Sequence, residues 1–419
     1  MNKQIKLTIG IIIDTSLKIP PNTGVTYRLY FLSKKMSELG MGIKIFLCNR
    51  NIKNDKNASI LFDKSNIEYH IIPENIFYDN KKLFKIISKN KLDILQFEDC
   101  QTLIRCREIW NLLNIPVCLE MHDIEATLKD YLGFSSKDIK DAEIITKTAC
   151  SLANQVICMT SLDFNELTKK NSIIKKKLSI LPNPINMEDF PFYGPSLENL
   201  SIIFIGNMFY WPNNNAVKFI ISKIYPKLKN IKNLKIYFVG MAPKYFSKYN
   251  KNKKIIFTGS VDNLNKYLKM ASIALCPITE GSGMKVKILN YCSAGLPTIT
   301  TNIGASGYEK IKSLIIEDNI ENYANIIKNL YSDKKNLFKI GENNRKYLTK
   351  NFDINKIAQK TITLYKKVIK NHKKYSKLEI NSNTIDKPLW LKEDRLNPIK
   401  NKNYYIIKNG KIIYKEKIT

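Results

Sequence analysis

Residues 274–291 read ALCPITEGSGMKVKILNY, which is the pattern of an apolar strand, a glycine-containing loop and the start of a helix. Gly281 and Gly283 permit close backbone approach and unusual dihedral angles in that loop. The first N–H groups of a helix lack intrahelical partners, and the helix dipole favours an anion beside them. The segment therefore predicts a phosphate site. A plain glycine turn ahead of an amphipathic helix with solvated lysines is the alternative interpretation.

The helical part of this segment carries side chains suited to a nucleotide. Lys287 and Asn290 are three residues apart and share one helix face. We expect Lys287 to bind a diphosphate and Asn290 to hydrogen-bond the ribose hydroxyls. Lys285 points elsewhere if it is helical, and its place near the loop makes it a second phosphate contact. Ser282, between the two glycines, joins the same predicted donor-binding set.

Short β-branched runs alternate with helical patterns along most of the chain, and the runs are apolar throughout. Such strands, separated by helices, indicate a parallel sheet covered on both faces. Expected strands are 5–13, 43–47, 68–72, 92–97, 116–120, 155–159 and 178–181, then 200–205, 234–239, 255–258, 273–277, 297–301 and 314–317. Expected helices are 25–39, 80–88, 102–113, 138–152 and 161–170, then 213–228, 263–270, 285–294, 320–330, 333–349 and 354–370.

The alternation breaks after residue 181, where a segment rich in Pro, Gly and polar residues follows. We therefore predict an α/β fold with two tandem Rossmann-like, doubly wound domains facing a central cleft. Ligands of such sheets bind at the carboxyl ends of the strands. The predicted divisions are a first domain at 1–185, a linker at 186–199, a second domain at 200–352, a C-terminal helix at 353–374 that packs back across the domains, and a tail at 375–419.

The tail contains YYIIKNGKIIY at 404–414, which predicts a β-hairpin with a type I′ turn at Asn409 and Gly410. A lone two-stranded hairpin is marginally stable. We therefore expect it to dock on the body of the protein or on a partner.

Composition indicates the cellular compartment. The longest early apolar run, 7–13, is too short for a membrane span or a secretion signal, and the eight cysteines are scattered without a Cys-x-x-Cys pair. A cytoplasmic, reducing location is expected.

The net charge of +31 comes mostly from lysine. It is either a solvated surface or an attraction for anionic lipids, lipid-diphosphate acceptors or sugar nucleotides, with peripheral contact at the inner face of the membrane. Nucleic acid is not expected, because arginines and aromatic residues are not interleaved with the lysines.

Several segments occur in the order found in GT-B glycosyltransferases. Segment 280–297 with AGLPTITT at 294–301 resembles their donor-site signature, GNMFYWPNN at 206–214 resembles the glycine loop after the first donor-domain strand, and LPNPI at 181–185 resembles the interdomain element. Gly24 resembles the N-terminal glycine that approaches the phosphates. Over roughly 5–370 the chain is similar to the retaining family 4 enzymes, the glycosyl transferases group 1.

The resemblance implies roles for particular residues. It makes the first domain the acceptor side and the second the nucleotide-sugar side, and it adds Gly206 to the donor-binding set. Glu280 takes the first acidic position of the signature, whereas Asn290 stands where a related subgroup has glutamate. The residues Gly304, Ala305, Ser306 and Gly307, which follow strand 297–301, are expected to offer backbone N–H groups to the donor sugar or phosphates.

His122 follows the predicted strand 116–120, at the edge where the cleft should lie. The resemblance places it beside the transferred sugar, in a His-Asp pair with Asp123. A helix cap is the second interpretation of Asp123. Glu98 and Asp99, at the end of strand 92–97, are acceptor-side candidates.

The implied activity is transfer of a sugar from a nucleoside-diphosphate sugar to a glycan or lipid-linked acceptor, with retention, in cell-surface polysaccharide or glycoconjugate synthesis. Without an Asp-x-Asp motif, no metal ion and no other cofactor is expected. Two alternatives stay open. One is a sugar-nucleotide epimerase on the same scaffold, which needs several acid/base carboxylates in the cleft. The other is a catalytically degenerate GT-B binding subunit, which the amide at Asn290 suggests.

Overall fold

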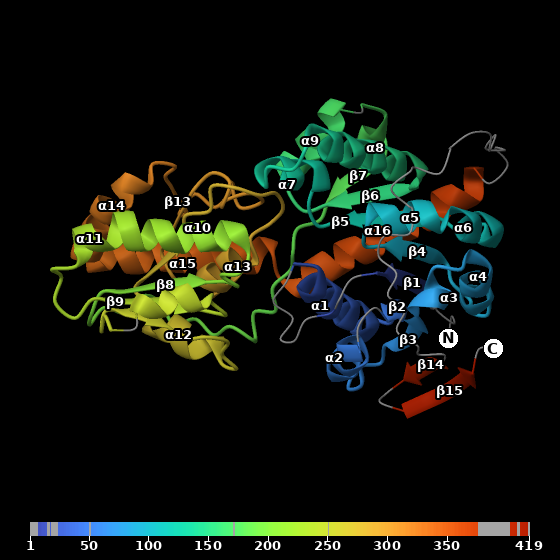
Figure 1. Cartoon of the computed structure of the whole chain (residues 1–419), viewed down its shortest axis with the longest axis horizontal. Helices are drawn as coiled ribbons and strands as arrows, with labels where there is room; N and C mark the ends of the chain where they lie inside the picture. Colours follow the sequence, from blue (N-terminus) through green and yellow to red (C-terminus); the bar gives the residue numbers. More distant parts are fainter. Residues whose placement is uncertain are drawn as a thin grey trace.

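The strands of the protein form two sheets in two separate lobes (Figure 1). The structure is a computed structural model that describes residues 7–14, 17, 24–49, 52–170, 172–249, 251–375, 403–408 and 411–417. The predicted fold of two parallel α/β domains is confirmed. Every strand expected in these domains is present, with its ends within a few residues of the prediction.

The first sheet has the order β15-β14-β3-β2-β1-β4-β5-β6-β7. Its strands are β1 (Thr8–Ile13), β2 (Gly42–Asn49), β3 (Glu68–Pro73), β4 (Ile94–Phe97), β5 (Val117–Met121), β6 (Gln155–Cys158), β7 (Leu178–Ile180), β14 (Asn403–Lys408) and β15 (Lys411–Lys417). The connecting helices are α1 (Gly24–Glu38), α2 (Ile52–Phe62), α3 (Glu74–Phe77), α4 (Asn80–Ser88), α5 (Cys100–Arg105), α6 (Arg107–Leu113), α7 (Glu125–Tyr131), α8 (Ser136–Leu152) and α9 (Ser161–Lys170), followed by the 3-10 turn η1 (Ser172–Lys177). β1 to β7 are parallel, and separate apolar clusters cover the two faces of the sheet.

The second sheet is parallel, with the order β10-β9-β8-β11-β12-β13. Its strands are β8 (Ser201–Ile205), β9 (Lys235–Val239), β10 (Ile255–Phe257), β11 (Ile273–Cys276), β12 (Thr298–Thr300) and β13 (Ile315–Ile316). Its helical segments are α10 (Trp211–Phe219), η2 (Ile220–Ile224), α11 (Tyr225–Leu228), η3 (Lys244–Tyr249), α12 (Leu264–Met270), α13 (Val286–Ser293), η4 (Ile320–Asn322), α14 (Tyr323–Ser332) and α15 (Lys334–Asn351).

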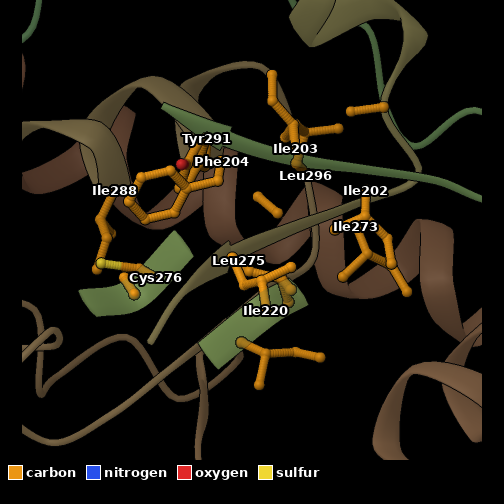
Figure 2. Close-up of a cluster of buried hydrophobic side chains, with 14 of the residues drawn as sticks. Ile202, Ile203, Phe204, Ile220, Ile273, Leu275, Cys276, Ile288, Tyr291 and Leu296 are labelled. Carbon is orange, nitrogen blue, oxygen red and sulfur yellow. The ribbon is translucent and has the colours of Figure 1, made fainter. Parts of the chain in front are cut away.

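Helix α13 is fixed to the second sheet by buried side chains. Ile288 and Tyr291 pack among Phe204 of β8 and Cys276 of β11 (Figure 2). The Tyr291 hydroxyl accepts a hydrogen bond of 2.7 Å from the backbone N–H of Ile205. Burial of each large apolar side chain contributes roughly 1.5–3 kcal/mol. This burial favours a single position of the helix on the sheet. The N-terminus of α13 is therefore held at the carboxyl end of β11.

The chain returns to the first domain through α16 (Ile354–Tyr375). Ile185 and Ile354 lie side by side where the chain crosses between the domains, because the Ile354 N–H donates to the Ile185 carbonyl at 3.0 Å. Beyond this crossing, α16 packs in the core of the first domain through Ile357, Tyr365 and their neighbours.

The tail forms the expected hairpin, with β14 antiparallel to β15. The predicted turn residues, Asn409 and Gly410, lie outside the described residues. β14 also pairs antiparallel with β3, in the register Ile406 to His70 and Lys408 to Glu68. The hairpin thus docks on the body of the protein and extends its first sheet.

Several helical segments differ from the sequence prediction. The helix expected at 102–113 is divided at Cys106 into α5 and α6, and the one expected at 213–228 contains the π-helical turn η2. α2 and α7 were not predicted. In the part of the chain that the structure describes, none of the helices combines the length and apolarity that crossing a membrane requires.

Candidate active site

The loop between β11 and α13 lies against the first domain. Gly281 and Gly283 have positive φ angles of 98° and 70°. A Cβ atom at Gly283 would lie 2.4 Å from the backbone oxygen of His122, so only glycine fits there. The Ser282 hydroxyl accepts a hydrogen bond of 3.2 Å from the Ile124 N–H. The predicted phosphate loop and the predicted sugar-side histidine are therefore brought together.

Lys287 lies on α13 beneath the first turn after β8. Its Nζ is 2.5 Å from Asn213 Oδ1 and 4.2 Å from the centroid of the Phe204 ring. A Cβ atom at Gly206 would lie 3.1 Å from this Nζ, so a larger residue there would crowd the ammonium group. Burial lowers the pKa of Lys287 to about 8. A half-buried cation whose contacts in the described part of the chain are a neutral amide and an aromatic ring is suited to receive an anion.

Lys285 is the N-cap residue of α13 and does not belong to the helix. Its Nζ donates to the backbone oxygens of Ser282 at 2.8 Å and Gly283 at 2.9 Å. Burial lowers the pKa of Lys285, while the charges of Asp163 and Asp123 act in the opposite direction. Lys285 therefore closes the loop and adds a second positive charge at its base.

Glu280 and Asn290 each present an unused acceptor. Asn215 Nδ2 donates to Glu280 Oε1 at 3.3 Å. The other Glu280 oxygen, Oε2, and Asn290 Oδ1 are buried and have no hydrogen-bond partner among the described residues. Buried acceptors without partners are costly unless a ligand donates to them. Hydroxyl groups of a sugar or ribose are suitable donors.

The expectation that residues 304–307 offer free backbone N–H groups is wrong. Each of these groups already donates within its own turn, at distances of 2.9–3.3 Å. The acceptors are Thr301 Oγ1 for Gly304, the Thr301 carbonyl for Ala305, the Ile303 carbonyl for Ser306 and Glu309 Oε1 for Gly307. Glycine at 304 has a packing reason, since a Cβ atom would lie 2.2 Å from Thr300 Oγ1.

Gly24 is the first residue of α1, and a Cβ atom there would meet no atom within 4 Å. The residues at 18–23, just before it, lie outside the described part of the chain. No contact therefore explains the glycine, and its predicted approach to the phosphates stays a prediction.

His122 is held by Glu98. His122 follows β5, Glu98 follows β4, and His122 Nε2 lies 2.7 Å from Glu98 Oε2. Burial alone lowers the pKa of His122, but the hydrogen bond to Glu98 and the charges of Glu98 and Glu120 outweigh burial and raise it. The ring is therefore held by a buried carboxylate, and the acceptor-side role expected of Glu98 stays a prediction.

The other acceptor-side candidates have different surroundings. Asp99 is the N-cap of α5 and accepts from the Thr102 N–H at 2.7 Å, which is a structural role. The alternative interpretation of Asp123 as a helix cap is wrong, because Ile124 occupies the N-cap of α7 and that helix has no side-chain cap. Asp123 is exposed beside Gly283.

Asp163 is a site residue that the sequence analysis missed. It is 5% exposed and accepts from Thr160 Oγ1 at 2.7 Å, and the neighbouring Gly283 backbone and Lys285 act to lower its pKa. Burial raises its pKa. Asp163 thus joins the first domain to the phosphate loop. Its place in the first turn of α9 resembles ordinary helix-dipole compensation, and no local pattern distinguishes the two roles.

Residues 199–333 match the family model described as Glycosyl transferases group 1. These residues are a glycosyl transferase domain. It contains the whole of the second sheet and the loop from β11 to α13. Taken with the geometry of the loop, this match makes the chain a glycosyltransferase with the GT-B fold.

Relatives of this glycosyltransferase include a UDP-Gal:alpha-D-GlcNAc-diphosphoundecaprenol alpha-1,3-galactosyltransferase of Escherichia coli, 22% identical over 316 residues that cover 69% of this chain and 79% of the relative. A solved glycosyltransferase from Rickettsia africae has a TM-score of 0.67 and 17% identity, covering 88% of this chain and 100% of its own. Anabaena HepE in complex with UDP has a TM-score of 0.67 and 13% identity, covering 86% and 100%. At these identities the solved structures support the fold alone.

Proposed function

We propose that this glycosyltransferase transfers a hexosyl unit from a UDP-sugar to a lipid-diphosphate-linked glycan, with retention at the anomeric carbon. The observation that carries the proposal is the pair of lysines, Lys285 and Lys287, at the N-terminus of α13, directly across a glycine loop from His122. A nucleoside diphosphate leaving group requires positive charge at this kind of place.

The donor side would act by electrostatics. As the bond to the sugar breaks, negative charge develops on the diphosphate. Lys287 would meet that charge directly, and the N-terminus of α13 would add the positive end of the helix dipole. Asn290 Oδ1 and Glu280 Oε2, both buried and without partners among the described residues, would accept hydrogen bonds from the ribose and the sugar. No metal ion is required in this scheme, and we expect transfer to persist in EDTA.

The transferred sugar would lie between the phosphate loop and His122. Nε2 of His122 is engaged with Glu98, so Nδ1 is the ring nitrogen left to contact the sugar. The likeness to the E. coli galactosyltransferase makes UDP-galactose the first donor to try.

The acceptor would be presented at the cytoplasmic face of a membrane. The E. coli relative acts on a diphosphoundecaprenol-linked sugar, and the net charge of +31 suits both an acceptor diphosphate and an anionic lipid surface. Sedimentation with vesicles of phosphatidylglycerol and phosphatidylcholine tests this part. Binding that falls with added salt is expected, and binding equal to that of neutral vesicles would exclude it.

The decisive experiment is a transfer assay with a panel of UDP-, dTDP- and GDP-sugars, a polyprenyl diphosphate-linked N-acetylhexosamine acceptor, and acceptor-free controls. A UDP-hexose-dependent product with the donor's anomeric configuration, read by proton NMR, is expected. Conversion of the sugar nucleotide to its epimer without acceptor would favour the epimerase. Nucleotide binding with no turnover of any donor would favour the degenerate subunit.

A further inference from the structure

Behind His122, away from the phosphate loop, lies a row of buried polar side chains. Glu98, the carboxylate that holds the histidine, accepts a second hydrogen bond of 2.6 Å from Gln96 Nε2. The same Gln96 nitrogen donates to Glu120 Oε2, also at 2.6 Å. Gln96, Glu98 and Glu120 are all 5% exposed or less. One amide therefore bridges two buried carboxylates.

The row ends at an arginine on α1. Arg28 Nε donates to Glu120 Oε1, and the two side chains are 1% and 2% exposed. Arg28 Nη1 donates to the Pro182 carbonyl at 2.7 Å, in the segment where the chain leaves the first domain. Tyr27, the preceding residue, donates from its hydroxyl to the Pro184 carbonyl at 3.0 Å. The row thus runs from the interdomain segment to the cleft.

Helix α16 contributes one more member. The Tyr365 hydroxyl donates to Gln96 Oε1, the only oxygen of that amide. Tyr365 is fully buried. This contact fixes the amide orientation, since Gln96 must then direct its nitrogen to both carboxylates. A helix from the C-terminal end of the described body therefore sets the arrangement behind His122.

Two buried carboxylates, Glu98 and Glu120, face one permanent cation, Arg28. Buried charges are strongly disfavoured without partners. The row is neutral when the His122–Glu98 pair is an imidazolium beside a carboxylate, or a neutral imidazole beside a carboxylic acid. Burial and the charge of Glu120 raise the pKa of Glu98, while the hydrogen bond of 2.7 Å to His122 lowers it and raises the pKa of His122. The hydrogen bonds that Glu98 accepts from Gln96 and His122 favour the ionic pair. The other charged groups near the ring are Asp123, its neighbour in sequence, and Lys285 at the start of α13, which interact with each other.

We propose that Arg28, Glu120, Gln96 and Glu98 are positioning residues that hold His122 as a cation, with Nε2 donating to Glu98 and Nδ1–H presented to the cleft. A cationic ring beside the phosphate loop would donate a hydrogen bond and would favour the negative charge that develops in transfer. This use of His122 rests on the proposed function, whereas its charge and orientation do not.

The chain has only three histidines, so the signals of His122 can be assigned and its charge followed directly. The full-length protein, labelled with ¹³C and ¹⁵N at histidine, is titrated by NMR, and His122→Gln and His372→Gln variants assign the signals. We expect His122 to titrate above the ordinary value of about 6.5. Glu98→Gln should lower its pKa by about one to three units, because it removes the carboxylate at the ring.

Two further variants sharpen the test. Arg28→Gln should raise the pKa of His122, because it removes the opposing positive charge. Glu98→Gln should lower the same pKa, and a general loss of structure would not shift it in opposite directions in the two variants. Glu68→Gln is the matched control. Glu68 Oε1 lies 2.9 Å from His70 Nε2, in the same first sheet, so this change should move His70 and leave His122 unchanged. If Arg28→Gln does not fold, Glu98→Gln and Glu68→Gln decide the matter alone.

A kinetic readout accompanies the titration. Glu98→Gln should lower kcat at least tenfold and leave KM for the donor within about twofold. Its effect should be largest between the His122 pKa of the variant and that of the wild type, where only the wild-type ring is charged. A wild-type His122 that titrates at or below 6.5, or one that Glu98→Gln leaves unmoved, would overturn the inference. Failure to turn over any sugar nucleotide would instead refute the proposed function, since the titration requires no substrate.

Discussion

The two sides of the cleft are built on opposite plans. On the proposed donor side, Lys287 contacts a neutral amide and an aromatic ring, and the acceptors on Glu280 and Asn290 have no partners among the described residues. On the histidine side, His122 lies at the end of a row in which each side chain hydrogen-bonds the next, and Arg28 Nη2 is buried without a partner among the described residues. We infer that the donor side needs a ligand to supply charge and hydrogen bonds. The histidine side holds His122 in place without a ligand.

The comparison predicts that variants of the donor side lose affinity and variants of the histidine side lose turnover. Lys287→Ala should have the largest effect. It removes the cation that meets the diphosphate, which is worth about 1.5–3 kcal/mol in binding, and it leaves the developing charge of the leaving group unmet as well. We expect transfer below detection. Lys269→Ala, an exposed lysine on α12, is the control and should retain the wild-type rate.

His122→Ala should lower kcat by about 10²-fold, the usual range for a group that assists proton or charge development at the reacting centre. KM for the donor should change little, because no histidine atom is expected to contact the nucleotide. Steady-state kinetics with saturating acceptor check this. An unchanged kcat would remove His122 from the chemistry.

The affinity for UDP should depend on pH through Lys287. Its pKa is lowered by burial to about 8, and only the ammonium form attracts the diphosphate. Affinity should fall about twofold between pH 7 and pH 8, where half of the lysine is neutral, and then by up to about tenfold per pH unit. The second ionisation of a phosphate lies near pH 6, so the ligand does not change in this range. Lys287→Arg should remove the decline, and a decline that persists would point to another group.

Variants of Asn290 test whether its unpaired side-chain oxygen accepts a hydrogen bond from the ribose. Asn290→Ala should weaken UDP about three- to tenfold, the worth of one neutral hydrogen bond. Asn290→Glu should strengthen it, because a carboxylate makes charge-assisted bonds to both hydroxyls. Titration calorimetry with UDP and with 2′-deoxy-UDP separates a contact to the ribose 2′-hydroxyl from other effects of the substitution. Equal affinities for both ligands in all three proteins would refute the ribose contact.

The smallest effect is expected at Asp163, which joins the two sides without contacting a ligand. Asp163→Ala removes a buried carboxylate beside Gly283 and Lys285, so the loop before α13 should hold its shape less well. KM for the donor should rise only about two- to threefold, with kcat nearly constant. Asp262→Ala, an exposed aspartate before α12, should behave as wild type. A loss confined to kcat would contradict this role.

Local sequence patterns were sufficient to predict the strands and the glycine-containing loop between β11 and α13. The strands are continuous apolar runs, and Gly281, Gly283, Lys285 and Lys287 lie within seven residues of one another. The groups that were missed come from distant parts of the chain. Arg28 and Glu120 are 92 residues apart, and Tyr365 is 269 residues from Gln96. Periodicity reports which face of an element is buried, but it cannot report which buried polar groups meet.

Two errors have the same origin. Residues 304–307 have the composition of an open loop, yet the turn that they form uses all of their N–H groups. Asp123 precedes α7 in the position of a cap, yet the backbone turns so that Ile124 is the N-cap. In both places residue types were read correctly, and the local path of the chain decided the outcome.

The most direct test of the division between the two sides is calorimetric titration of UDP into the wild type, Lys287→Ala and His122→Ala at pH 7. We predict one saturable site in the wild type, unchanged affinity in His122→Ala, and a loss of at least tenfold in Lys287→Ala. Wild-type affinity in Lys287→Ala, or an equal loss in both variants, would contradict the claim that the loop before α13 binds the donor diphosphate.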